Sequence, residues 1–207
     1  YGESRSEDGK PYSSLGVSCF TSKDLKKWTN HGLVLPVSNE PGSDIEGGCI
    51  IERPKVLYNK KTKKFVMWFH LELKGRGYGA ARYGVAVSDT PFGPFRFIRS
   101  GRVNPGIYPV GFAKPDTTDL KHQLLFPEMK FWWTPEWRKQ IERGMFWMRD
   151  FAGGQMSRDM TIFIDDDGKA YHIYSSEDNL TLQIAQLTDD YMQHNGSYVR
   201  VAAGGQN

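Results

Sequence analysis

The sequence predicts an all-β fold, and three observations lead to that prediction. Short segments rich in β-branched and aromatic residues follow one another along most of the chain, separated by Gly, Asp, Asn or Pro. Helical periodicity is rare, and one arrangement of strand, polar turn and aromatic residue occurs three times. The expected strands are residues 15–20, 55–58, 65–71, 84–88, 95–99, 160–164, 170–175 and 180–185.

The composition fits a globular domain and excludes several other classes. Of 207 residues, 39% are hydrophobic and 14% aromatic, which is more than a disordered chain carries. A net charge of +3 gives no electrostatic reason to expect a nucleic-acid partner. No apolar run reaches about 18 residues, so no membrane span is expected, and this sequence contains no signal-peptide pattern. The two cysteines, Cys19 and Cys49, have neither the spacing of zinc ligands nor the density of a disulfide-rich protein, so they do not indicate a redox compartment.

The recurring pattern is typical of β-propeller blades. Its copies lie at residues 16–28, 84–95 and 183–191, and further strands flank each of them. Four antiparallel strands in a repeated unit are characteristic of a propeller blade. A meander of hairpins would produce the same rhythm, so both architectures remain open at this point.

Counted in blades, the chain is expected to hold about three. The first unit, residues 1–50, begins at its second strand, and units two and three cover residues 51–103 and 156–207. Residues 104–155 fit no blade and are expected to form an insertion with one helix over 134–148, where Thr134 and Pro135 form a helix start. The insertion is rich in Trp, with Trp132, Trp133 and Trp137.

Two short motifs are interpreted as turns. Residues 75–80 match a G-x-G-x-x-A dinucleotide pattern, but a strand rather than a helix follows, which favours a glycine-rich hairpin. Residues 165–168, Asp-Asp-Asp-Gly, lack the spacing of a calcium loop, and Asp-Gly between strands favours a hairpin turn.

Acid–arginine pairs occur at equivalent places in two units. Glu52-Arg53 and Arg158-Asp159 each lie at the start of an expected inner strand. Paired carboxylates around a cleft catalyse glycoside hydrolysis. The many aromatic residues point the same way, because sugar rings stack on aromatic side chains. A structural ion pair between units is the alternative. His70 and His172 are interpreted as structural strand residues.

Longer motifs give a more specific indication. Residues 52–59, 65–70 and 157–171, together with Tyr1-Gly2-Glu3, resemble glycoside hydrolase family 43, in the branch of exo-β-1,3-galactanases and galactan β-1,3-galactosidases. The resemblance covers nearly the whole chain except the insertion. It implies a five-bladed β-propeller, hydrolysis with inversion, and release of galactose from the non-reducing end of β-1,3-galactan.

The resemblance also implies roles for individual residues. It assigns Asp159 and Glu52 to the catalytic set, and Glu3, Arg53, Tyr78 and Arg158 to substrate binding. The general acid and base of that family would follow Asn207, so the chain is expected to be an inactive piece of a longer glycosidase.

Other specificities remain open. An α-L-arabinofuranosidase or β-xylosidase of the same family, or a non-catalytic carbohydrate-binding propeller, would share much of the pattern. An oligo- or polysaccharide is the expected partner, and no cofactor is expected. The presence of a structural calcium ion is left open, because the sequence shows no recognisable set of metal ligands. The resemblance implies a secreted or periplasmic protein.

Overall fold

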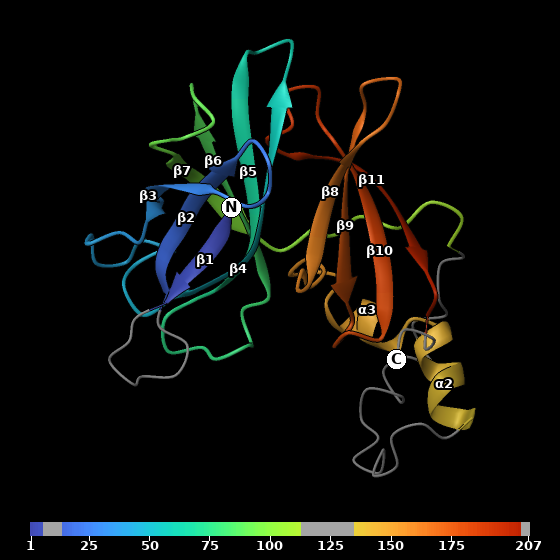
Figure 1. The fold of residues 1–207 in the computed structure, drawn as a ribbon. Coiled ribbons are helices and arrows are strands. Elements are labelled where there is room, and N and C mark those ends of the chain that lie inside the picture. Colours follow the sequence, from blue (N-terminus) through green and yellow to red (C-terminus); the bar gives the residue numbers. More distant parts are fainter. Residues whose placement is uncertain (6–13, 113–134, 204–207) are drawn as a thin grey trace.

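The computed structural model describes residues 1–5, 14–112 and 135–203, and these form three antiparallel sheets with two short helices (Figure 1). The all-β prediction is therefore confirmed at the level of fold class. The sheets stand side by side and do not close into a ring within the part described. Each sheet is a meander in which neighbours in sequence are neighbours in space. This order follows from hairpin connections, which keep antiparallel partners close in the chain.

The first sheet has three strands in the order β1-β2-β3. These are β1 (Gly2–Arg5), β2 (Ser14–Ser22) and β3 (Trp28–Pro36). Glu3 of β1 pairs with Val17 of β2. The short strand β1 therefore places the Glu3 side chain beside the neighbouring sheet, where β1 contacts β4.

The second sheet has the order β4-β5-β6-β7. Its strands are β4 (Ile50–Asn59), β5 (Lys64–Glu72), β6 (Arg82–Ser88) and β7 (Arg96–Gly101). The register between β4 and β5 shifts between Glu52 and Lys55, and Arg53 in this bulge has a positive φ of 55°. A bulge redirects side chains, and it often occurs next to a functional site.

The third sheet has the order β8-β9-β10-β11 and repeats the second. Its strands are β8 (Met160–Ile164), β9 (Ala170–Ser176), β10 (Thr181–Leu187) and β11 (His194–Val201). The expected turn of residues 165–168 is present: the amide of Asp165 donates to the carbonyl of Lys169, and Gly168 has a φ of 81°. The glycine-rich segment 75–80 lies in the connection between β5 and β6, as expected for a hairpin.

The helical prediction for residues 134–148 is wrong in one respect. Instead of one helix, the structure has α2 (Pro135–Glu142) and α3 (Met145–Arg149). Gly144 interrupts them because its φ of 90° lies in the left-handed region, which ends an α-helix. Trp132 and Trp133 lie outside the described residues. None of the helices described is both long and apolar enough to cross a membrane.

Two hydrophobic clusters lie between neighbouring sheets. The first joins β2 and β3 to the second sheet through residues such as Val17, Leu35 and Phe69. The second joins the second and third sheets, and at its centre the buried indole of Trp68 donates from Nε1 to the carbonyl of Tyr191 at 2.8 Å. Burial on both faces therefore fixes the second sheet between its neighbours.

Candidate active site

The predicted site residues come from all three sheets and meet at one end of them. Glu52 lies near the start of β4, Asp159 directly precedes β8, and Glu3 lies in β1. Strand β4 contacts both β1 and β8, so these edge strands of neighbouring sheets bring the carboxylates together. The starts of β4 and β8, beside β1, are therefore the place where side chains from separate sheets converge.

Glu52 has three side-chain neighbours. Its Oε1 accepts hydrogen bonds from the Arg5 guanidinium and from the Tyr78 hydroxyl, each at 2.9 Å. Its Oε2 lies 3.3 Å from Nδ1 of His70. The residue is 9% exposed, so these three groups take the place of most of the water around the carboxylate.

This surrounding keeps Glu52 ionised. The pKa of Glu52 is lowered to about 2, chiefly by the His70 imidazole, with the Tyr78 hydroxyl and the Arg5 charge also lowering it against the opposing effect of burial. At neutral pH the carboxylate is a hydrogen-bond acceptor. It has no proton to donate to a leaving group.

A second set of ion pairs extends from Glu52 towards the third sheet. Arg5 also pairs with Glu3 at 2.8 Å, and Glu3 lies 4.0 Å from Arg53. Arg53 in turn donates from Nε to Oδ1 of Asp159 at 2.7 Å. The Asp159 side chain is 62% exposed, so its carboxylate is accessible to a ligand while it is held by Arg53.

The β5–β6 connection, residues 73–81, holds Tyr78 against Glu52. Arg102 donates to the carbonyls of Gly79 and Ala80, each at 2.9 Å, and Arg158 donates to the carbonyl of Tyr78 at 3.1 Å. Asp150, which directly follows α3, pairs with Arg102 at 3.2 Å. The backbone carbonyls of the loop are thus held by Arg102, which directly follows β7, and by Arg158, which lies shortly before β8.

All six predicted site residues belong to this arrangement. Arg158 faces the protein, because its guanidinium contacts the Tyr78 carbonyl and lies 3.8 Å from Asp178. Sequence reasoning missed Arg5 and interpreted His70 as structural. A signal was present for His70: it lies two residues before Glu72 in a strand, so both side chains point to the same face.

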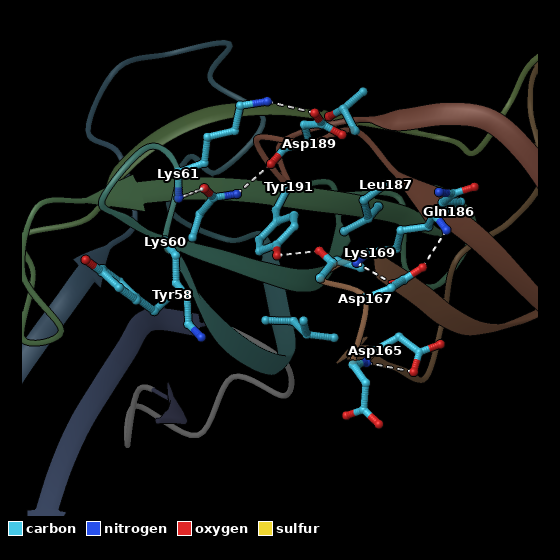
Figure 2. A pocket seen from close by; sticks show the side chains of 16 residues that line it. Tyr58, Lys60, Lys61, Asp165, Asp167, Lys169, Gln186, Leu187, Asp189 and Tyr191 are labelled. Atoms are coloured by element: carbon cyan, nitrogen blue, oxygen red, sulfur yellow. Dashed lines mark hydrogen bonds and ion pairs between the residues drawn. The ribbon is translucent and has the colours of Figure 1, made fainter.

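A groove of about 500 Å³ lies at the other end of β4 and β8, away from these carboxylates (Figure 2). It lies between the β4–β5 and β8–β9 turns and the β10–β11 connection. Figure 2 shows Lys61 reaching Asp189 and Lys169 reaching Asp167 around it. The nitrogen–oxygen distances of these two ion pairs are 2.8 and 2.5 Å. Two ion pairs therefore line it, and none of the predicted site residues does.

Within residues 1–5, 14–112 and 135–203, no group of three or more His, Cys, Asp or Glu side chains is arranged to hold a metal ion. The two cysteines, Cys19 and Cys49, are buried and free. The side chains clustered around Glu52 and Asp159 are carboxylates, guanidinium groups, an imidazole and a phenol. Such groups bind the hydroxyls of a sugar.

Several solved structures of glycoside hydrolase family 43 are similar to this chain. It is 59% identical to a family 43 β-1,3-galactosidase determined with galactodeoxynojirimycin, with a TM-score of 0.83; the match covers 93% of this chain and 55% of that one. Another β-1,3-galactosidase of family 43 is 34% identical, with a TM-score of 0.66, covering 93% and 31%. An exo-β-1,3-galactanase from Clostridium thermocellum is 33% identical, with a TM-score of 0.69, covering 99% and 35%.

The chain spans about half the length of the first of these structures and about a third of the other two. No protein-family model and no curated protein sequence matches it.

Proposed function

We propose, from the premise that the chain belongs to glycoside hydrolase family 43, that the protein carrying it releases galactose from the non-reducing end of β-1,3-galactan. The proposed reaction proceeds with inversion at the anomeric carbon. The observation that supports it is the identity of 59% to a β-1,3-galactosidase over 93% of this chain.

The geometry supports a division of roles between two carboxylates. Glu52 is ionised and nearly buried, so we assign it to accepting hydrogen bonds from the hydroxyls of the terminal galactose. Asp159 is exposed and held by Arg53, so we assign it to orienting the reacting groups. An inverting hydrolase also needs an acid and a base about 6.5–9.5 Å apart, with room for a water molecule. We assign neither of these two roles to Glu52.

Two features support a propeller as the complete architecture, and the number of five blades comes from the resemblance to family 43. The inner strands β4 and β8 converge, as strands around a central channel do. One face of the third sheet is covered by the hydrophobic cluster, whereas the other carries apolar side chains that are partly or largely exposed and belong to none of the hydrophobic clusters of the described residues. These side chains are Phe163, Tyr171, Ile173, Leu182 and Ile184. We infer that another blade packs on this face.

The alternatives are less well supported. An α-L-arabinofuranosidase or β-xylosidase would act on pentoses, yet the three relatives above are galactosidases or a galactanase. A non-catalytic carbohydrate-binding module needs no water-activating machinery, and only an assay separates it from an enzyme. Since the proposed substrate is a polysaccharide, we also propose a secreted or periplasmic location.

The experiment is an assay of the full-length gene product that contains this chain. β-1,3-Galactan, arabinan and xylan are incubated with it, and the released sugars are separated by chromatography. We expect free galactose from galactan alone, and proton NMR during the first minutes should show it as the α-anomer, because inversion of a β-linkage gives that product.

Two results would overturn the proposal. Release of arabinose or xylose without galactose would assign the protein to a pentosidase. Binding of galactan without release of any sugar would assign it to the non-catalytic alternative.

A further inference from the structure

Glu72 is a fully buried carboxylate at the end of β5, with a relative exposure of 0%. Its Oε1 lies 2.9 Å from Nε2 of His70. Its Oε2 accepts hydrogen bonds from the backbone N–H groups of Ala80 and Ala81, at 2.8 and 2.9 Å. Burial of a charged side chain is costly unless it is paired and hydrogen-bonded, and these three bonds meet that condition.

The hydrogen-bond partners of Glu72, which are the His70 imidazole and the backbone of the loop, are both connected to Glu52. His70 is hydrogen-bonded to Glu72 on one side, and on the other its Nδ1 lies 3.3 Å from the Glu52 carboxylate. Tyr78 precedes Ala80 by two residues, and its hydroxyl donates to Glu52 at 2.9 Å. One buried carboxylate therefore fixes two of the three neighbours of Glu52.

We propose that Glu72 is a positioning residue, which orients Glu52 through the His70 imidazole and through the backbone of the loop that carries Tyr78. The proposal rests on the proposed function, because it assigns Glu52 to binding the terminal sugar. Outer residues of this kind decide how accurately a binding group is held, and a displacement of about 1 Å can cost on the order of 100-fold in rate.

The charge of His70 is the physical link between the two carboxylates. The titratable groups that face His70 are Glu52, Glu72 and the Tyr78 ring, whose centroid lies 6.1 Å from that of the imidazole; Arg5 lies beyond Glu52. Burial lowers the pKa of His70, but the two carboxylates together outweigh burial, and the pKa is raised. The imidazolium form places a positive charge between two negative ones.

The variant Glu72→Gln separates the two ways in which Glu72 acts. A glutamine oxygen still accepts the N–H groups of Ala80 and Ala81, so the loop keeps its anchor. Its amide carries no charge, so His70 loses one of the two carboxylates that stabilise its protonated form. We expect the pKa of His70 to fall, and that of Glu52 to rise towards its ordinary value.

The experiment follows both quantities in the full-length protein. Nitrogen-15 NMR of the histidine rings gives the titration of His70 in wild type and in Glu72→Gln. The His70 signals are assigned as those that disappear in His70→Gln. Kinetics on β-1,3-galactan give kcat/KM, which we expect to fall on the order of 10-fold to 100-fold. The acid limb of its pH profile should move to higher pH because Glu52 protonates earlier.

Glu46→Gln is the matched control. Glu46 pairs with Lys74 at 3.6 Å, at the start of the same loop, and is not among the neighbours of Glu52 described above. This variant makes the same chemical change near the loop, and it should leave the titration of His70 and the pH profile as they are in wild type.

The outcomes separate this proposal from the proposed function. An unchanged His70 titration, together with kcat/KM within twofold of wild type, would overturn the positioning role even if galactose is released. If the wild type releases no galactose, the proposed function fails. The positioning role then stands if Glu72→Gln lowers both the pKa of His70 and the affinity for galactodeoxynojirimycin measured by calorimetry, and it falls if neither changes. If Glu72→Gln does not fold, the wild-type spectrum decides, because a neutral His70 ring at pH 6 contradicts the proposal.

Discussion

Arg53 donates from Nε to Oδ1 of Asp159 at 2.7 Å and thereby joins the second sheet to the third at the site. The two residues are 106 positions apart in the sequence. The bulge in β4 makes the contact, because the left-handed backbone of Arg53 turns its side chain out of the regular alternation of the strand. The exposed carboxylate is therefore fixed in orientation while it stays open to a ligand.

Asp159→Asn should lower kcat on β-1,3-galactan on the order of 100-fold or more with little change in KM. An amide cannot carry the negative charge that the proposed orienting role needs, and such a role acts on the transition state rather than on ground-state binding. Steady-state kinetics of the full-length protein measure both constants. Asp166→Asn, in the exposed β8–β9 turn, is the control and should match wild type. An unchanged kcat in Asp159→Asn would remove this residue from the catalytic set.

Glu52 should make the folded state more stable as the pH rises from about 2 to its ordinary pKa of 4.5. Its pKa is lowered on folding, so the unfolded chain binds more protons in this window; the contribution is complete above the ordinary value and is lost as the pH falls towards 2. Urea denaturation between pH 5 and pH 2 measures the effect. Glu52→Gln should flatten this part of the curve, and an equal slope in both proteins would contradict the assignment.

Much of the fold could be predicted because the signals are local. The eight expected strands all overlap observed ones, since alternation and turn residues act over a few positions. The break at Gly144 was missed, because a glycine tolerated in a helix and one that ends it look alike in sequence. The Trp-rich part of the insertion, with Trp132 and Trp133, lies outside the described residues.

The site was only partly predictable because its neighbours depend on contacts between sheets. Glu52 and Asp159 were found through motifs, whereas Arg5 reaches Glu52 from a strand 47 residues earlier. No local pattern reports that pairing. His70 illustrates the same limit: its strand position was evident, but its place between two carboxylates depends on the orientation of β4 against β5.

The buried His172 and the partly buried His194 should make the protein less stable below neutral pH. Nδ1 of His172 lies 3.0 Å from Nε2 of His194, and both imidazoles contact the rings of Trp68 and Tyr83. Burial lowers the pKa of His194 to about 3 and that of His172 well below its ordinary value. In the unfolded chain both rings protonate near pH 6.5. Their contribution to stability is therefore complete above that pH and is lost as the pH falls from it towards the lower pKa values of the folded protein.

Thermal denaturation at pH 7.5 and at pH 5 tests this pair. The loss of stability between the two values should be smaller in His194→Gln than in wild type, because one of the two groups no longer titrates. His31→Gln is the control, since His31 of β3 contacts Thr21 of β2 and Phe92 of the β6–β7 connection and lies outside this pair. A loss of the same size in His194→Gln and in wild type would show that the pair does not set the pH dependence.

Arg200 and Glu177 form a buried ion pair that fixes the insertion to the third sheet. The side chains are 4% and 0% exposed, and the guanidinium contacts both carboxylate oxygens, at 2.5 and 2.8 Å. The same guanidinium donates to the carbonyls of Ile141 and Glu142 at the end of α2. A cation at the C-terminus of a helix also satisfies carbonyls that have no partner within the helix.

Arg200→Met should destabilise the protein by about 3–5 kcal/mol, because it leaves the Glu177 carboxylate buried without its cation. The double variant Arg200→Met, Glu177→Gln should regain much of this loss, since no charge is then left unpaired. Urea denaturation of the two single variants and the double variant gives the coupling energy between the residues. If the double variant is as unstable as the sum of the single ones, the effect comes from lost packing against α2 and not from the buried charge.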